Sequence, residues 1–310
     1  MQRYILPLRP ENKRNPAFSY LSSLPSSNSN VTMSNCLKTV AKLLGRNDIF
    51  EVDWSALRRQ HCLRVMDMLK LKGLAPATIN LHLYGMKGVA REAWSMDLMP
   101  QAAYLKIQAL KGLHYARLPT GRSLTAHQCK KLLDVCEDGS LRGIRDRAIL
   151  AVMMGCGLRR AEVSSLEVAN WNEKDRTFTF IGKGNKQRRV YLPPDLIDPL
   201  TRRINIRGLD EGAIFPAIYK GNGEHEFFKI RNMLPSSINR IVSRRAKQAK
   251  IPKLTPHDLR RTFATKMLNA GIDLFVLQQS MGHASLATTV RYDRRGEHAK
   301  EKAAKALKFL

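Results

Sequence analysis

The sequence has few cysteines and no long apolar run. Its five cysteines are scattered, odd in number and form no Cys-x-x-C pair, so neither a disulfide framework nor a structural zinc site is expected. The longest apolar run, Ala148–Met154, is far below the roughly 20 residues of a membrane-spanning helix. The N-terminus lacks the apolar segment of a signal peptide. These absences exclude a membrane partner and predict a cytoplasmic protein.

Acidic side chains are scarce relative to basic ones. The chain has 53 Lys and Arg against 26 Asp and Glu, a formal net charge of +27 and a pI near 10.3. Residues 1–118 hold 17 basic and 7 acidic side chains, and residues 119–310 hold 36 and 19. Because the excess is present in both regions, it is not a single basic tail. It predicts a polyanionic partner that both regions contact.

The first 30 residues are poor in the apolar side chains that a core needs. They are rich in Pro, Ser and Asn, so we expect residues 1–30 to form a flexible arm. Apolar residues then recur at spacings of three and four, which predicts a small bundle of four helices over residues 31–114. These helices are expected to begin near Val31, Trp54, Pro76 and Asp97.

Residues 115–122 break the helical periodicity and predict a linker before a second domain at 123–310. This domain opens with Thr125-Ala-His-Gln128, a capping box. Glycines and an Asn between two β-type runs predict a hairpin over Arg176–Leu192. The fold class is therefore mainly α with a small antiparallel β-hairpin or sheet. The other predicted helices are Ile144–Cys156, Asp195–Arg203, Leu234–Lys250, His257–Ala270, Leu274–Met281, Leu286–Tyr292 and a tail helix at Glu297–Phe309.

One stretch near the C-terminal end gathers side chains that suit phosphate chemistry. His257 and Arg260 are three residues apart and share one face of a predicted helix. His283 follows a glycine, and Tyr292 comes nine positions later. Each has an ordinary explanation when taken alone: a surface pair, a helix cap or a core aromatic.

Two further residues lie about a hundred positions upstream. Arg159 stands at a junction between helices, where a lone Arg is usually a solvated surface charge. Lys183 lies at the predicted hairpin tip, between two glycines. The Gly-Lys-Gly lacks the spacing of a phosphate-binding loop and a following helix, so it does not support ATP binding.

The combination of these side chains is more specific than any one of them. A phenol is a poor nucleophile at neutral pH, so attack on a phosphodiester needs a base or hydrogen-bond partner beside it. Two Arg guanidinium groups can bind the phosphate oxygens, and two His side chains can donate hydrogen bonds or move a proton. A Lys can protonate the leaving oxygen. This chemistry requires no metal and no cofactor.

With these residues in place, the chain resembles the tyrosine recombinases, the family of phage integrases and Xer-type enzymes. The resemblance is close over residues 123–295 and looser over 31–111. It is carried by Gly157-Leu-Arg-Arg-Ala-Glu162, Gly182-Lys-Gly-Asn-Lys186, His257-Asp-Leu-Arg260, Met281-Gly-His283 and Tyr292. The family's catalytic residues would then be Arg159, Lys183, His257, Arg260, His283 and Tyr292.

The resemblance also implies a fold and roles. Residues 31–114 would be a helical, SAM-like core-binding domain, and residues 123–310 a mixed α+β catalytic domain. Tyr292 would be the nucleophile and Lys183 the acid, with Lys186 as an alternative acid. Further DNA contacts are expected from basic residues of the hairpin and of the helix Leu234–Lys250, namely Lys186, Arg188, Arg240, Arg244, Arg245 and Lys247.

Three departures from the family pattern are present. Arg261 stands where many members have His, Met281 stands where Leu is usual, and Tyr-Asp-Arg-Arg replaces a frequent Tyr-Thr/Ser-His. None of them alters a predicted catalytic position, so they bear on the subfamily more than on activity.

The expected function is site-specific recombination of double-stranded DNA through a 3′-phosphotyrosyl intermediate, without metal or ATP. The resemblance implies a homotetramer on two duplexes at the nucleoid, and it allows for accessory DNA-bending proteins. Two alternatives stay open at this point. One is a type IB topoisomerase, which reseals the same strand, and the other is a non-catalytic DNA-binding protein on the same fold.

Overall fold

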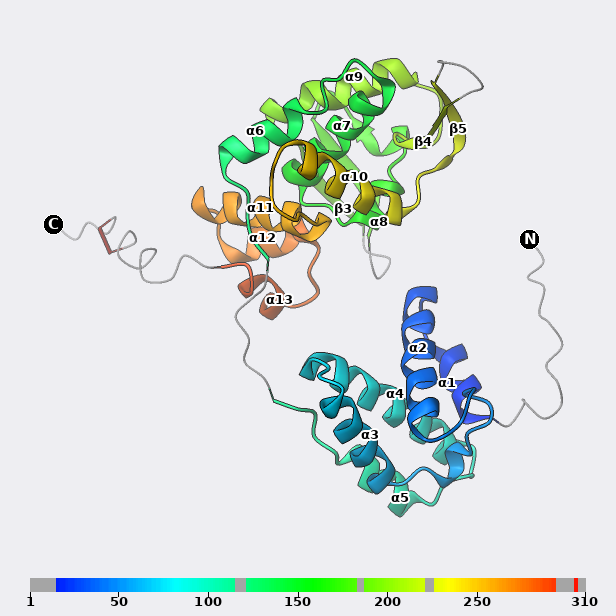
Figure 1. The fold of residues 1–310 in the computed structure, drawn as a ribbon. Coiled ribbons are helices and arrows are strands. Elements are labelled where there is room, and N and C mark those ends of the chain that lie inside the picture. Colours follow the sequence, from blue (N-terminus) through cyan, green and yellow to red (C-terminus); the bar gives the residue numbers. More distant parts are fainter. Residues whose placement is uncertain (1–14, 115–120, 183–186, 221–225, 294–303, 306–310) are drawn as a thin grey trace. The chain divides into compact units, whose positions relative to one another are not determined.

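A computed structural model describes residues 15–114, 121–182, 187–220, 226–293 and 304–305 (Figure 1). The chain divides into two compact units, residues 1–118 and 119–310, each with its own hydrophobic core. Among the described residues, no helix is both long and apolar enough to cross a membrane.

All the regular secondary structure in the described part of unit 1 is helical. Helix α4 lies at its centre and packs against four other helices (Figure 1). The core also holds Trp54, which is 1% exposed and donates from its indole Nε1 to the carbonyl of Ile49 at 2.7 Å. The elements are α1 (Pro16–Ser23), α2 (Ser27–Leu43), the 3₁₀ turn η2 (Trp54–Ala56), α3 (Arg59–Leu71), α4 (Pro76–Ser95) and α5 (Gln101–Gln108).

The expectation of a flexible arm over residues 1–30 is wrong for residues 15–30, and residues 1–14 lie outside the described part. Helix α1 is capped by Asn15, whose side chain accepts from the Ala17 amide at 2.9 Å. Tyr20 is 6% exposed and packs so closely on α4 that a Cβ at Gly88 would lie 2.2 Å from its ring. The polar composition masked a short amphipathic face, on which residues 16, 17, 20 and 21 are buried.

Unit 2 is built around α7 (Leu141–Cys156), which contacts five other helices and strand β3. The longest apolar run of the sequence, Ala148–Met154, lies in this helix and is almost fully buried. The predicted capping box is present, because Thr125 Oγ1 accepts from the Gln128 amide at 3.2 Å and Gln128 Oε1 accepts from the Thr125 amide at 3.1 Å. The other helices are α6 (Ala126–Asp134), α8 (Arg160–Ser164), α9 (Ile197–Arg207), α10 (Pro235–Gln248), α11 (Pro256–Asn269), α12 (Leu274–Met281) and α13 (Leu286–Val290), with 3₁₀ turns η3 (Val168–Asn170) and η4 (Pro194–Leu196).

The predicted hairpin is part of a three-stranded antiparallel sheet. Its strands β1 (Trp171–Asn172), β2 (Thr177–Ile181) and β3 (Gln187–Tyr191) follow the order of the chain. A second, two-stranded sheet, β4 (Pro216–Lys220) and β5 (Glu226–Asn232), was not predicted. The predicted fold class, mainly helical with a small antiparallel sheet, is confirmed. Residues 304–305 are helical, and the rest of the predicted tail helix lies outside the described residues.

Candidate active site

The turn after α7 places Arg159. Gly157 ends the helix with φ of 60°, and a Cβ there would lie 2.3 Å from the Phe263 ring, so only glycine fits. Arg159 then caps α8, and its backbone amide donates to Glu162 Oε2 at 2.8 Å. The Arg159 guanidinium reaches the same carboxylate, with Nη1 2.8 Å from Oε1. Glu162 thus holds Arg159 by both its backbone and its side chain.

Helix α11 places Arg260 against this turn. Thr255 and Asp258 form a capping box that starts the helix, which presents His257 and Arg260 at a spacing of three. Arg260 is 3% exposed. Its Nη1 donates to the Gly157 carbonyl, and its Nη2 donates to the Met281 carbonyl at 2.6 Å and to His283 Nε2 at 2.9 Å. Three of its five N–H donors are therefore used by the protein.

His283 is held in one protonation state by its neighbours. Arg260 can only donate, so His283 Nε2 must accept, and its proton lies on Nδ1, 2.9 Å from Thr289 Oγ1. Burial and the nearby Arg260 lower the pKa of His283 to about 4, which agrees with a neutral ring. At neutral pH this histidine orients Arg260 and has no second proton to give.

Tyr292 lies just after α13, with its ring in a small core formed with α11 and α12. The residue is 7% exposed. Its hydroxyl is 3.4 Å from His257 Nε2, and its ring stacks on His283 at a centroid distance of 5.6 Å. Burial, followed by the cations of Arg261 and Arg260, lowers the pKa of His257. A neutral His257 beside a phenol is a group able to accept its proton.

Two cations remain close to each other without a full set of protein partners. Arg159 donates from Nη2 to the Gly282 carbonyl at 3.2 Å, and its side chain is 33% exposed. Burial, followed by the nearby Arg159, lowers the pKa of Arg260 to about 10. Both line a cleft of about 280 Å³. Closely spaced cations repel each other, and an anion such as a phosphate would relieve that repulsion.

The structure brings together five of the six predicted catalytic residues, namely Arg159, His257, Arg260, His283 and Tyr292. Lys183 and Lys186 lie outside the described residues. Sequence reasoning missed Asn239 of α10, which lines the cleft, and Thr289, which fixes the His283 proton. No motif marked these two, because their roles depend on contacts between separate helices.

Arg188 was predicted to contact DNA, but the structure buries most of its side chain. Its side chain is only 10% exposed, and Nη2 donates to Glu162 Oε2 at 2.7 Å. Its guanidinium also lies 4.9 Å from the centre of the Phe180 ring. Arg188 therefore ties strand β3 to the carboxylate that holds Arg159.

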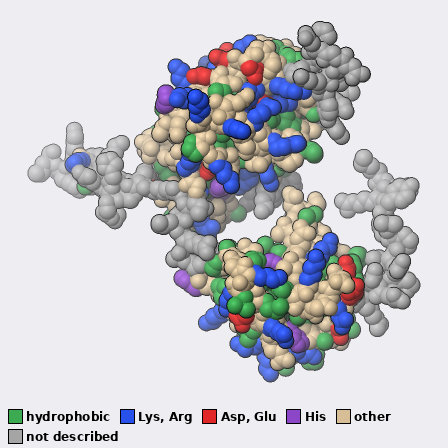
Figure 2. Space-filling view, in the orientation of Figure 1, with side chains coloured by type: hydrophobic (Ala, Val, Ile, Leu, Met, Phe, Trp, Pro, Cys, Tyr) green, Lys and Arg blue, Asp and Glu red, His purple; other side chains and the backbone are tan. Residues whose placement is uncertain are grey.

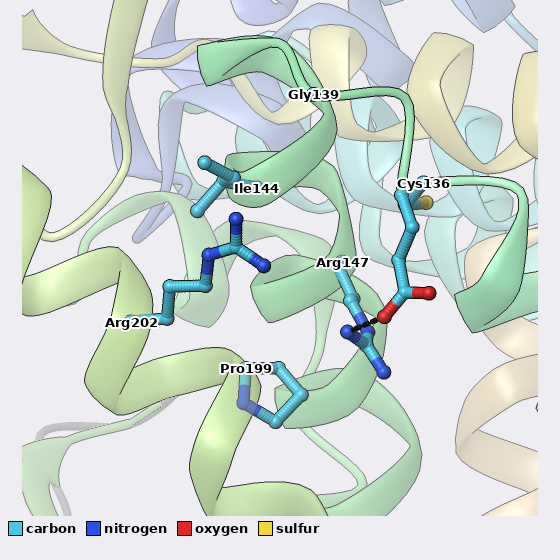
Figure 3. Close-up of a pocket in the computed structure, with 7 residues that line it drawn as sticks. Cys136, Gly139, Ile144, Arg147, Pro199 and Arg202 are labelled. Atoms are coloured by element: carbon cyan, nitrogen blue, oxygen red, sulfur yellow. Dashed lines mark hydrogen bonds and ion pairs between the residues drawn. The ribbon is translucent and has the colours of Figure 1, made fainter.

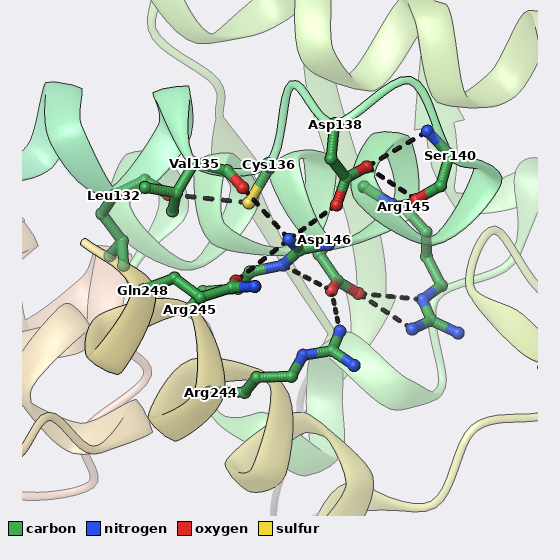
Figure 4. Close-up of polar contacts among 11 residues, drawn as sticks. Leu132, Val135, Cys136, Asp138, Ser140, Arg145, Asp146, Arg244, Arg245 and Gln248 are labelled. Carbon is green, nitrogen blue, oxygen red and sulfur yellow. Dashed lines mark hydrogen bonds and ion pairs between the residues drawn. The ribbon is translucent and has the colours of Figure 1, made fainter.

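Arg245 is a second correction. Figure 4 shows it beside the fully buried Asp146, which also binds Arg145 and Arg244. The Arg245 side chain is 3% exposed and pairs with Asp138 as well, at 2.9 Å. It stabilises the packing of α10 on α7 and cannot face DNA. Arg244 has one end tied to Asp146 and is half-exposed, and Arg240 and Lys247 are exposed on α10.

Another hollow, of about 380 Å³, lies between α7 and α9 (Figure 3). It contains an ion pair between Arg147 and Glu137 and none of the predicted site residues. Figure 2 shows Lys and Arg side chains on the visible face of both units. Within the part of the chain that the structure covers, no three His, Cys, Asp or Glu side chains are grouped so as to hold a metal ion.

The chain is similar in sequence to known proteins. The model of the phage integrase family matches residues 122–298. Tyrosine recombinase XerA of Pyrococcus furiosus is 32% identical over 252 residues, covering 79% of each sequence. Tyrosine recombinase XerC of Chromohalobacter salexigens is 27% identical over 243 residues, covering 78% of each.

Solved structures show the same fold. A lambda integrase fragment, solved as a dimer bound to a COC′ core site, covers 90% of this chain and 93% of its own, with 15% identity and a TM-score of 0.67. The XerH recombinase, solved as a post-cleavage complex with a palindromic difH substrate, covers 90% and 77%, with 20% identity and a TM-score of 0.64. On the family match and the identity to XerA, the chain belongs to the phage integrase family and is a tyrosine-type site-specific DNA recombinase.

Proposed function

We propose that Tyr292 is the nucleophile that cuts DNA, with His257 as the acceptor of its proton. The observation that carries this is the approach of the Tyr292 hydroxyl to His257 Nε2, 3.4 Å away, beside Arg159 and Arg260. This distance is longer than a good hydrogen bond, and such contacts commonly tighten when substrate binds.

The proposed first step is a transesterification. The Tyr292 oxygen attacks the scissile phosphorus, and its proton passes to His257. The bond from phosphorus to the 5′ oxygen breaks, leaving a 3′-phosphotyrosyl link, and the 5′ oxygen takes a proton, for which Lys183 is proposed. In the second step the 5′ hydroxyl of a partner duplex attacks this link and restores the tyrosine.

Arg159 and Arg260 are proposed to bind the non-bridging phosphate oxygens as negative charge builds on them. Arg260 keeps two N–H groups outside its three bonds to the protein, and Arg159 keeps three outside its bonds to Glu162 and Gly282. The protein bonds fix the orientation of both guanidinium groups before DNA arrives. The bound phosphate then meets donors that need no reorganisation.

The proposed partners are double-stranded recombination sites, bound by four copies of this chain on two duplexes. The excess of basic side chains in both units and the exposed Arg240 and Lys247 on α10 support contact with the DNA backbone. The relatives and solved structures described above are recombinases and integrases, so they do not favour a topoisomerase or a non-catalytic binder.

The test is covalent capture on a nicked suicide substrate, in which loss of a short 5′ fragment prevents religation. Wild-type protein should form an adduct, and Tyr292→Phe should bind the same DNA and form none. Tyr191→Phe is the matched control, because Tyr191 is 66% exposed on β3 and should keep wild-type adduct formation. An adduct in Tyr292→Phe would sink the assignment. Transfer of the captured strand to a second duplex separates recombination from resealing.

A further inference from the structure

Arg261 contacts the ring of the proposed nucleophile, Tyr292. It follows Arg260 on α11, so the two side chains leave the helix about 100° apart. Arg261 is 7% exposed, and its guanidinium carbon lies 5.7 Å from the centre of the Tyr292 ring. That distance is within the range of a cation–π contact.

Residues 121–124 enter the catalytic unit along the same helix. Leu124 donates from its amide to Thr262 Oγ1 at 2.9 Å, and the Arg122 amide donates to Asp258 Oδ1 at 3.2 Å. Arg261 Nη1 lies 3.4 Å from the Gly121 carbonyl, which accepts from it. Positions 258, 261 and 262 thus form one face of α11 that holds the entering chain.

Gly121 shows how closely this segment approaches the helix. Its φ is +99°, and a Cβ there would lie 2.8 Å from Asp258 Oδ1 and 3.1 Å from the guanidinium carbon of Arg261. No other residue fits that conformation and that gap without displacing a neighbour. Of the three α11 side chains that hold the segment, Arg261 also contacts the Tyr292 ring.

Arg261 is a third cation near His257, in addition to Arg260 and Arg159. Burying its guanidinium costs desolvation, and the nearby carboxylate of Asp258 offsets part of that cost. The contacts of Arg261 with the Tyr292 ring and the Gly121 carbonyl indicate a role beyond filling space in the core.

We propose that Arg261 is a positioning residue that holds the Tyr292 ring beside His257 and ties it to the segment entering the catalytic unit. This rests on the proposed roles of Tyr292 and His257. In this proposal Arg261 acts through the Tyr292 ring that it contacts.

The proposal has a consequence for pH dependence. His257 faces the cations of Arg261, Arg260 and Arg159, the carboxylate of Asp258 and the Tyr292 hydroxyl. Burial, then Arg261 and Arg260, lower its pKa, so it stays neutral to lower pH than an ordinary histidine. Removing the Arg261 charge raises this pKa. Because His257 must be neutral to accept the proton, the fall in cleavage rate at acid pH should then begin at a higher pH.

The experiment measures single-turnover adduct formation on the nicked substrate from about pH 5 to 9, a range that spans the ordinary histidine pKa. Arg261→Gln should slow cleavage about tenfold near pH 7, by loss of the cation–π contact, and shift the acid side upward. DNA affinity should not change. Arg261→Lys should restore the wild-type profile and part of the rate.

Thr262→Val is the matched control. Thr262 binds the same segment through the Leu124 amide, and its side chain is fully buried. This variant should therefore have a lower melting temperature and keep the wild-type dependence of cleavage rate on pH. An unchanged profile in Arg261→Gln, or an equal shift in Thr262→Val, overturns the proposal. If Arg261→Gln does not fold, Arg261→Lys and Arg261→His decide: the lysine variant should be faster at pH 8, and equal rates contradict the idea.

Failure of the underlying function is visible separately. It would show as an absence of wild-type adduct, or as an adduct in Tyr292→Phe, whatever the Arg261 variants do.

Discussion

Arg159 and Arg260 carry the same charge, but the fold uses them differently. Arg260 is almost fully buried and donates to two backbone carbonyls and to His283. Arg159 is a third exposed and is held mainly by Glu162. The first is therefore part of the core as well as the site, and the second is the more accessible donor.

This difference predicts two kinds of loss. Arg159→Ala should slow adduct formation by roughly 10² to 10⁵, the range for removing a charged transition-state donor, with a small change in melting temperature. Arg260→Ala should show a similar loss of rate and also a lower melting temperature. The substitution leaves the Gly157 and Met281 carbonyls without a hydrogen-bond donor, which should lower the free energy of unfolding by about 2 kcal/mol or more. Thermal melts and single-turnover rates on the same samples test this, and equal melting temperatures for the two variants would contradict it.

At the scale of elements, the ends of helices place two of the proposed catalytic side chains. Gly157 ends α7 before Arg159, and Gly282 ends α12 before His283, both with positive φ. The Gly282 carbonyl accepts from Arg159, and the Gly282 backbone passes so close to Arg188 that a Cβ would lie 2.1 Å from its Nη1. The Gly282 backbone therefore contacts both Arg159 and Arg188 and directly precedes His283.

Gly282→Ala should for this reason impair cleavage more than stability alone explains. The substitution adds backbone strain of about 1–3 kcal/mol and pushes Arg188 away from Glu162. Gly271→Ala is the control, because Gly271 also has positive φ, of 86°, but no atom within 4 Å of a Cβ. The rate should fall by well over tenfold in Gly282→Ala, after correction for the folded fraction, and stay near wild type in Gly271→Ala. Similar rates in both variants would refute the close-packing argument.

Much of the site could be predicted from sequence because its residues occur in short motifs. His257 and Arg260 share a helix turn, and a glycine before His283 or Arg159 signals a helix end. Contacts between distant residues carry no such signal. Arg245 follows Arg244 in a basic run that suggests DNA binding, yet Asp146, 99 residues earlier, makes it a core residue. Helix α1 was missed because its apolar face is only four residues wide.

At the scale of the whole molecule, the net charge of +27 governs how the protein meets DNA. Each phosphate that a Lys or Arg neutralises releases counterions, so affinity should fall steeply as salt rises. The structure divides the basic side chains of α10 into exposed ones, such as Arg240 and Lys247, and the buried Arg245. Only the exposed ones are placed to contribute to that slope.

Arg240→Gln should lower the slope of log affinity against log salt by about 1, and so should Lys247→Gln. Arg245→Gln should leave the slope unchanged and lower the melting temperature, because it removes a partner from the buried carboxylate of Asp146. Fluorescence anisotropy with a labelled duplex, across a series of salt concentrations, measures the slopes. A reduced slope in Arg245→Gln, with no loss of stability, would contradict the buried role of Arg245 and indicate that it contacts DNA.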